Sequence, residues 1–397
     1  MNNIKLFIFL NNNLWFFLLF FSNNILLAQE KFSNYKKYSK TTQEFKLVEV
    51  ADSLNYPWGM TFIDKENLLV TEKNGRLLKI NVKTGIKREI KHQIQNIRFK
   101  NEKNISTQQG GLLDVLYNDG WVYFTYSHVL KKNNSDERSF KKVSSTAIAR
   151  GILKDNKISD LKVLLIGKPK LNSSKHFGSR LVIKDGFIFA SFGERGLGMI
   201  AQDPEKHPGS IVRIKSDGSL PSDNPKMKGK KNWLPEIYQI GVRNPQGMTI
   251  NPKNNKIFFS NHGPRGGDSI GLVKFAGNYG WKKIAWGGTE YIGKKIGKSA
   301  LNDIYDKPIK IWVPSIGIGN LAFYEGKTFP NWAGDLLVTA TNAEMLIRLS
   351  FKNGKINREE FILKNEIGRI RDLEIDSNGD IYLISDEFDS ILWKITK

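Results

Sequence analysis

Short apolar runs alternate with turn residues along most of the chain, and one such unit recurs six times. In each copy an apolar strand meets a turn that contains Gly, Asn or Asp, and a second apolar strand follows, as in RLVIKDGFIFASFG at 180–193. A turn of this kind between alternating hydrophobic residues is a strong signal for a β-hairpin. The copies lie at 59–80, 113–127, 180–193, 247–260, 321–349 and 373–395.

The spacing of these six units predicts the fold class. They recur at intervals of about 50–75 residues, and helical periodicity is scarce throughout. A repeat of this length with several strands per unit is typical of a β-propeller. We therefore expect an all-β protein, a six-bladed β-propeller over 45–397, in which a strand near 45–50 completes the last blade. A large β-sandwich is the alternative, but it would not explain six similar hairpins.

The first 28 residues have a different character from the rest of the chain. Lys5 gives a positive start, 14–21 (LWFFLLFF) is apolar, and Ala28 is a small residue at the end of the segment. This pattern predicts a signal peptide at 1–28 that is cleaved on export, followed by a polar tail at 29–44. An uncleaved anchor is the alternative, but it would place several asparagines at membrane depth, where unpaired polar groups are costly. We expect a periplasmic protein without stable membrane insertion after cleavage.

Composition narrows the classes of chemistry and partner. The 397 residues include no cysteine, so disulfides, thiolate metal sites and a cysteine nucleophile are excluded. Lys and Arg number 61 against 39 Asp and Glu, a net charge of +22. Nucleic acid or an anionic surface is one interpretation of that charge. The lysines are spread thinly, however, in a chain that is also rich in Asn and Ile, so we favour a compositional bias and expect no nucleic-acid partner.

Four polar residues share one position relative to the predicted hairpins. Each lies just before a hairpin, and the four hairpins belong to four different blades. Equivalent positions in different blades of a propeller converge on one mouth of the central channel, so we expect these side chains to meet there. The residues are Gln109, His176, Arg243 and Arg369. Taken singly, each has an ordinary alternative: a turn with a solvent-facing Gln, a loop histidine, or surface pairing of an arginine.

The neighbours of these residues suggest what the mouth contains. Arg369 and Arg371 are two apart in a predicted strand and share a face, which suits carboxylates or phosphates. His176 can act as a general base because its pKa lies near neutral, and Glu194 could supply a carboxylate that orients the imidazole. With one base, three arginines and amide donors, the mouth suits a planar, polyanionic ligand.

The loop HGPRGGD, at 262–268, adds a candidate metal site. The carbonyl oxygens of Gly263 and Pro264 could bind a hard cation, since calcium accepts backbone oxygens. The alternative is a strained turn stabilised by pairing of Arg265 with Asp268. Several unusual groups cluster here, so we favour a functional loop.

These motifs together resemble the glucose/sorbosone dehydrogenase family over about 45–397. The motifs that carry the resemblance occur in order along the chain: YPWGM at 56–60, QGGLLDV at 109–115, HFGSRLV at 176–182, DGSLPSDNP at 217–225, GVRNPQGM at 241–248, HGPRGGD at 262–268, NYGW at 278–281 and RIRD at 369–372. The resemblance implies a quinoprotein that uses pyrroloquinoline quinone (PQQ) and calcium (Ca2+). It also implies oxidation of aldose sugars at C1 to lactones, with electrons passed to an external electron acceptor.

The resemblance also implies individual residue roles. His176 would remove the proton of the anomeric hydroxyl, and Arg243 would stabilise negative charge that develops on the quinone oxygen. The carbonyls of Gly263 and Pro264 would hold the calcium that polarises PQQ. The remaining residues would position the cofactor or line its site: Gln109, Asn244, Ser315, Arg369 and Arg371.

Three positions depart from the family pattern. A lysine that pairs with PQQ in many relatives is absent near 339–344, where Asn342 takes its place. Asn261 replaces an acidic residue before HGP. Ser269 replaces an acidic residue that is a ligand of a second, structural calcium in relatives. The resemblance therefore supports the calcium site at Gly263 and Pro264 more strongly than this second site. The alternative function is a redox-inactive propeller that binds a sugar or another ligand; the presence of both His176 and Arg243 argues against it.

Overall fold

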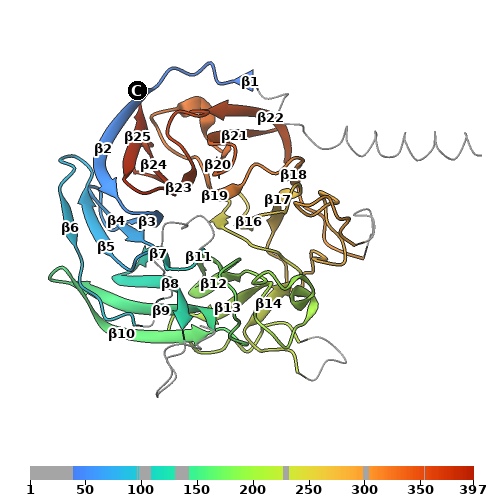
Figure 1. Cartoon of the computed structure of the whole chain (residues 1–397). Helices are drawn as coiled ribbons and strands as arrows, with labels where there is room; N and C mark the ends of the chain where they lie inside the picture. Colours follow the sequence, from blue (N-terminus) through green and yellow to red (C-terminus); the bar gives the residue numbers. More distant parts are fainter. Residues whose placement is uncertain are drawn as a thin grey trace, which may run out of the picture.

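The computed structural model describes residues 39–95, 97, 109–129, 143–226, 232–297, 304–352 and 354–397. Six sheets are arranged around a central axis, so the expectation of a six-bladed β-propeller is confirmed (Figure 1). The signal peptide predicted at 1–28 lies outside the described residues. Within the described ranges, no helix has the length and apolar character that a membrane crossing requires.

Each blade is an antiparallel sheet built outward from the axis. Blade 1 consists of β3 (Pro57–Phe62), β4 (Asn67–Glu72), β5 (Leu77–Asn81) and β6 (Lys87–Glu89); blade 2 of β7 (Leu112–Asn118), β8 (Trp121–Val129), β9 (Ser144–Lys154) and β10 (Lys157–Ile166); and blade 3 of β11 (Gly178–Lys184), β12 (Phe187–Phe192), β13 (Ser210–Lys215) and β14 (Ile237–Ile240). The six predicted units overlap the first two strands of the six blades, and the units at 59–80, 321–349 and 373–395 also reach the third strand.

The second half of the ring repeats this plan. Blade 4 consists of β15 (Gly247–Ile250), β16 (Ile257–Asn261), β17 (Asp268–Leu272) and β18 (Lys310–Trp312); blade 5 of β19 (Ile318–Phe323), β20 (Leu336–Ala340), β21 (Met345–Lys352) and β22 (Lys355–Ile362); and blade 6 of β23 (Ile370–Ile375), β24 (Ile381–Ser385), β25 (Ser390–Thr396) and β2 (Lys46–Leu54). The short β1 (Ser39–Lys40), within the predicted polar tail, adds to β22 in parallel.

The ring closes as the sequence predicts. β2, from the beginning of the propeller, pairs with β25 from its end, with Lys46 opposite Thr396. The first strands of the blades contact one another in the circular order β3, β7, β11, β15, β19, β23 and back to β3. A sheet assembled from both ends of the chain fixes the circle, so residues far apart in sequence face the same central channel.

Apolar side chains fill the spaces between blades. Phe258 on β16 packs edge-on against Phe323 on β19, with ring centroids 5.0 Å apart, inside a core cluster that spans blades 4 and 5. A comparable cluster joins blades 5 and 6 around Leu337 and Leu373. Because both faces of a blade pack on neighbours, strand residues that point to either face are apolar, and the continuous hydrophobic runs follow from this.

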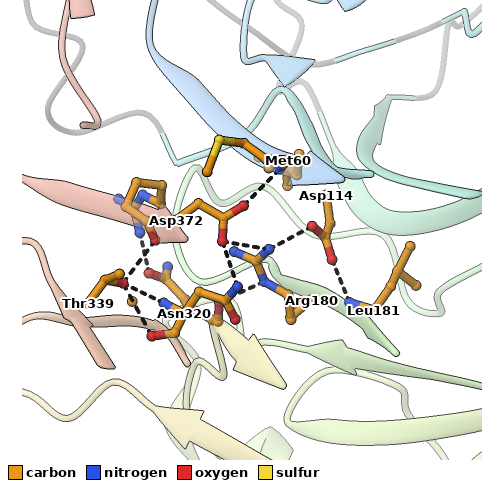
Figure 2. Close-up of polar contacts among 12 residues, drawn as sticks. Met60, Asp114, Arg180, Leu181, Asn320, Thr339 and Asp372 are labelled. Carbon is orange, nitrogen blue, oxygen red and sulfur yellow. Dashed lines mark hydrogen bonds and ion pairs between the residues drawn. The ribbon is translucent and has the colours of Figure 1, made fainter. Parts of the chain in front are cut away.

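Buried charges form a layer around the axis. The Arg180 guanidinium donates to Asp114 at 2.7 Å, forms an ion pair with Asp372 at 3.1 Å, and its Nε donates to the Gln246 carbonyl at 3.0 Å (Figure 2). Arg180 and both carboxylates have side chains at most 4% exposed. These four residues belong to blades 2, 3, 6 and the turn that precedes blade 4.

The remaining two blades join the same network through Asp372. Its carboxylate accepts the Met60 backbone N–H at 2.8 Å from blade 1 and the Asn320 side-chain amide at 2.6 Å from blade 5 (Figure 2). The network thus links five blades and the turn before the remaining one, blade 4. The Arg180 guanidinium lies 4.5 Å from the centre of the Trp58 ring, and Trp58 lines a cavity.

Candidate active site

A cavity of about 300 Å³ lies where the first strands begin. The structure brings six of the residues singled out in the sequence to its wall. All precede or begin the first strand of a blade, and they are Gln109, His176, Arg243, Asn244, Arg369 and Arg371. Four blades therefore contribute to one mouth, in the arrangement that the common position before the hairpins predicts.

A second set of lining residues follows the second strands of four blades, and only His262, within HGPRGGD, was singled out in the sequence. Lys73, His262, Thr341 and Asp386 come directly after the second strands β4, β16, β20 and β24, and all four line the cavity. In an antiparallel hairpin the end of the second strand lies beside the start of the first. The signal was therefore present in the sequence, as the polar residue that follows the second apolar strand in these four units.

His176 is held by contacts on both its side chain and its backbone. Its Nδ1 lies 2.6 Å from Glu194 Oε1, and its backbone N–H donates to Gln109 Oε1 at 2.7 Å. The backbone at His176 has φ of +50°, a left-handed conformation that is uncommon for a residue other than glycine. Because Glu194 occupies Nδ1, the Nε2 atom is the ring nitrogen left for chemistry.

The electrostatics around this pair favour a neutral imidazole. Burial, together with the positive charge of Arg243, lowers the pKa of His176 to about 4, against the opposing effect of Glu194. Burial acts to raise the pKa of Glu194, but hydrogen bonding and attraction to His176 outweigh it and lower that pKa. At neutral pH the carboxylate is thus ionised and the imidazole is free to accept a proton.

Arg243 and Asn244 occupy a turn that is fixed by one amide. The Asn261 Oδ1 accepts the backbone N–H groups of both residues, each at 3.0 Å. Asn244 in turn accepts the Gly178 N–H at 3.0 Å through its own Oδ1. An amide oxygen therefore suffices for this local role, although the family pattern has an acidic residue at position 261.

The HGPRGGD loop is anchored by a buried carboxylate. Asp268 Oδ1 accepts the Gly263 N–H at 2.6 Å, and Oδ2 accepts the Ile318 N–H at 2.8 Å from the next blade. A Cβ at Gly263 would lie 2.6 Å from the Gly267 backbone, so only glycine fits there. The Gly263 carbonyl accepts Arg243 Nη1 at 3.0 Å.

The two predicted calcium ligands lie beside the main cavity. Gly263 and Pro264 line a second, much smaller cavity together with Asn261 and Ser269, and Arg243 lines both cavities. In the part of the chain that the structure describes, no cluster of three His, Asp or Glu side chains could hold a metal ion. The described residues that line the small cavity offer the oxygens of backbone carbonyls, of the Asn261 amide and of side-chain hydroxyls such as that of Ser269.

One wall of the main cavity is a cluster of cations around a single aspartate. Asp386 forms ion pairs with both Lys73 and Arg371, and Arg371 also donates to the Gln246 side chain. Burial lowers the pKa of the Lys73 ammonium, and Arg371 adds to that effect by repulsion. Burial acts to raise the pKa of Asp386, but Arg371 and Lys73 reverse this and hold it below its usual range.

The donor set fits an anionic, planar ligand such as PQQ. Asp386 is the one carboxylate that forms ion pairs with this cationic set, through Lys73 and Arg371, among the described residues. The Arg369 guanidinium has a single hydrogen-bond partner within the described ranges, the Thr341 carbonyl at 3.4 Å. Arg371 Nε is buried and has no hydrogen-bond partner among the described residues. Buried donors of this kind are costly unless a ligand satisfies them.

Two predicted features lie outside the cavity wall. Ser315 is not among the lining residues; its backbone N–H donates to the Arg265 carbonyl at 3.0 Å. Asn342 occupies the position of the missing lysine and also does not line the cavity. Its backbone N–H donates to the Ile316 carbonyl at 3.0 Å. Lys73 instead brings an ammonium group into the cavity, from blade 1.

Comparison with known proteins places this site in context. The family model described as Glucose / Sorbosone dehydrogenase matches residues 54–394. The chain is 32% identical over 356 residues to aldose sugar dehydrogenase YliI of Escherichia coli (strain K12), a match that covers 87% of this chain and 91% of that protein. It is 26% identical over 268 residues to quinoprotein glucose dehydrogenase B of Acinetobacter calcoaceticus, covering 62% of this chain and 54% of that one.

A solved structure agrees with the fold and its extent. The crystal structure of the soluble aldose sugar dehydrogenase from Escherichia coli, in the apo-form, superimposes with a TM-score of 0.80 at 30% identity. The match covers 89% of this chain and 99% of that one.

Proposed function

The chain belongs to the glucose/sorbosone dehydrogenase family, and on that premise we propose that it is a quinoprotein aldose dehydrogenase. It oxidises the C1 hydroxyl of aldose sugars to lactones with PQQ as its bound cofactor. The observation that carries this proposal is the neutral His176, fixed by Glu194 and placed in the same cavity as Arg243 and a cationic wall.

The cationic wall would hold the cofactor. PQQ carries three carboxylates on a planar ring system, and planar guanidinium groups bind carboxylates well. Arg369 and Arg371 would take those carboxylates, with Lys73, which shares Asp386 with Arg371, as a further donor. Asn244 and Gln109 line the same cavity and supply amide groups. When bound, PQQ supplies the two-electron oxidation, as the acceptor of the hydride that leaves C1 of the sugar.

His176 would accept the proton of the reaction. As the C1–H bond breaks, the C1–O bond gains double-bond character and the anomeric hydroxyl loses its proton to the imidazole Nε2. The Glu194 carboxylate holds Nδ1 in its protonated form and stabilises the imidazolium that results. The positive charge of Arg243 would stabilise the negative charge that the bound cofactor gains.

Calcium would bind next to Arg243, on the carbonyl oxygens of Gly263 and Pro264. Calcium accepts backbone oxygens, and both residues line the small cavity that Arg243 shares with the main one. Because Arg243 already donates to the Gly263 carbonyl, the ion would share that oxygen or displace the guanidinium from it. We do not extend the proposal to a second calcium, since Ser269 and Asn261 offer no carboxylate.

The location of the enzyme is part of the same proposal. Residues 1–28 would direct export and be removed, so that the mature protein works in the periplasm and passes electrons to an external acceptor. Sequencing the amino terminus of protein recovered from the periplasm tests this: it should begin shortly after Ala28.

The test of the function is reconstitution. Protein made without PQQ is incubated with PQQ and calcium, passed through a gel-filtration column, and assayed with an aldose and an artificial dye. We expect retained PQQ absorbance and dye reduction that depends on sugar, and His176→Gln should retain PQQ but lose activity by about a hundredfold or more. Loss of PQQ on the column, without dye reduction, would contradict the proposal and favour a redox-inactive sugar-binding propeller.

A further inference from the structure

The mouth of the cavity differs chemically from its floor. We call the buried part of the lining its floor; it carries Lys73 and Arg371, with the half-buried Arg369. We call the exposed part its mouth; it carries the rings of Tyr291 and Phe388, with the half-buried Tyr56 paired to Phe388. Phe388 is 68% exposed and Tyr291 is 63% exposed, although both line a cavity. Large apolar side chains that stay exposed around a concave site are typical of ligand contacts.

Tyr56 and Phe388 form a pair across the boundary between blades 1 and 6. Their ring centroids are 6.2 Å apart and the ring planes are inclined by 49°. Lys73 Nζ lies 5.6 Å from the centre of the Tyr56 ring and forms an ion pair with Asp386. The pair thus sits directly against the cationic wall, so a ligand that contacts these rings would lie next to a cofactor held by that wall.

The backbone holds Tyr56 in an unusual conformation. Its φ is +48°, in the left-handed region that bulky residues rarely adopt. The Tyr56 N–H donates to the Glu387 carbonyl at 2.9 Å, and the Tyr56 carbonyl accepts the Lys73 N–H at 3.2 Å. Two loops from neighbouring blades therefore fix the Tyr56 backbone, and local backbone strain that the surroundings maintain is a recurrent feature of ligand sites.

We propose that the rings of Tyr56 and Phe388 form a platform for the pyranose ring of the substrate and so determine how tightly aldoses bind. The inference rests on the proposed function. The cations at the floor suit the carboxylates of the cofactor, whereas the aromatic rings at the mouth suit an uncharged ligand. A sugar ring presents C–H groups that pack on an aromatic face while its hydroxyls remain hydrated. Because the platform is at the mouth, it acts on sugar affinity and not on the proton transfer at His176.

The kinetic test is Phe388→Ser in the PQQ-loaded enzyme. We expect KM for an aldose to rise roughly threefold to tenfold, with kcat and PQQ affinity unchanged, as for the loss of one favourable ring contact. Phe388→Tyr, which keeps the ring, should retain the original KM. The matched control is Phe275→Ser: Phe275 is also exposed, at 61%, but it packs on Tyr238 and does not line the cavity. Its KM should stay at the wild-type value.

A binding measurement separates this proposal from the proposed function. Methyl glucoside cannot be oxidised at C1, because its C1 oxygen carries a methyl group. Saturation-transfer NMR should show transfer to its ring protons with wild-type protein, with or without PQQ, and weaker transfer with Phe388→Ser. Failure of the wild-type protein to retain PQQ would count against the proposed function alone.

Three outcomes would overturn the platform. One is an unchanged KM and unchanged NMR transfer in Phe388→Ser. Another is a fall in kcat without a change in KM. The third is a raised KM for the dye with an unchanged KM for the sugar, which would assign the rings to the electron acceptor.

Discussion

His176 combines a fixed orientation with a neutral charge state, and both come from burial and from residues in other loops of the ring. The Glu194 carboxylate and the Gln109 amide orient it, while burial and Arg243 keep its pKa low. A histidine at the surface of the same loop would be partly protonated at neutral pH. The surroundings therefore convert an ordinary loop histidine into a base that is ready at any pH above its lowered pKa.

This charge state predicts the acid limb of the pH profile. Only the neutral imidazole accepts a proton. Because His176 stays neutral between pH 8 and 5, its titration should not change kcat/KM over that range, and kcat/KM should fall as the pH approaches about 4. The measurement is kcat/KM for one aldose across buffers of constant ionic strength. An acid limb centred near pH 6.5 would contradict the buried, neutral histidine.

The cavity residues that precede the hairpins could be predicted from the sequence. Lys73, Thr341 and Asp386, which follow the second strands, were missed, for a physical reason. Gln109, His176, Arg243 and Arg369 share glycine-rich neighbourhoods that attract attention, and the structure brings all four to one cavity. Lys73 and Asp386 directly follow apolar strands and resemble ordinary surface charges. Only the antiparallel pairing of each hairpin makes the two sets adjacent. Ser315 was assigned on resemblance alone and lies outside the cavity wall.

At the scale of the element, the hairpins were predictable and the outer strands were not. β11 and β12 alternate apolar residues around an Asp-Gly turn, a local signal that needs no tertiary information. β6 is the tripeptide KRE and β18 is the tripeptide KIW. Such short strands form because a neighbouring strand offers free backbone groups, and composition alone does not reveal them.

The first strands also carry the network at the axis, and one arginine is its centre. Arg180→Met leaves Asp114 and Asp372 buried without their cation, so we expect the free energy of unfolding to fall by about 3–5 kcal/mol. Urea unfolding at pH 8 measures this. The matched control, Arg358→Met on the outer strand β22, changes a side chain that is 51% exposed and should cost at most about 1 kcal/mol.

The same variant predicts a pH dependence with a definite sign. Burial raises the pKa of Asp114 to about 7 and raises that of Glu374 well above its ordinary value. The Asp114 carboxyl holds a proton in the folded protein at pH 5 and loses it as the pH rises past about 7, so the missing cation matters more at high pH. The loss of stability in Arg180→Met should be smaller at pH 5 than at pH 8. An equal loss at both would contradict the ionic role.

At the scale of the whole molecule, ring closure by β2 and β25 lets a single cavity draw on all six blades and their adjoining loops. Lining residues come from blades 1, 2, 3, 5 and 6 and from the turn and loop around blade 4. A ligand held there contacts most of the ring at once, so its binding should stabilise the fold as a unit. The net charge of +22 is compatible with an anionic ligand but does not identify one.

Cofactor binding should therefore appear in thermal stability. PQQ at about a hundred times its dissociation constant adds roughly 2.7 kcal/mol to the free energy of unfolding, which raises Tm by a few degrees. The increase should require calcium and should disappear when EDTA is added, if the Gly263 and Pro264 carbonyls hold the ion beside the cofactor. An increase of the same size in EDTA would contradict the calcium site while leaving PQQ binding in place.

The most direct test of the central claim is a single turnover of the bound cofactor. Gel-filtered holoprotein is mixed anaerobically with an aldose and without dye, and the absorbance of PQQ is followed. The cavity assignment predicts that the sugar reduces one PQQ per chain and yields one lactone, while His176→Gln retains the oxidised spectrum. If wild-type PQQ stays oxidised in the presence of the sugar, or if His176→Gln reduces it at the wild-type rate, the assignment of this cavity as an aldose-oxidising site is wrong.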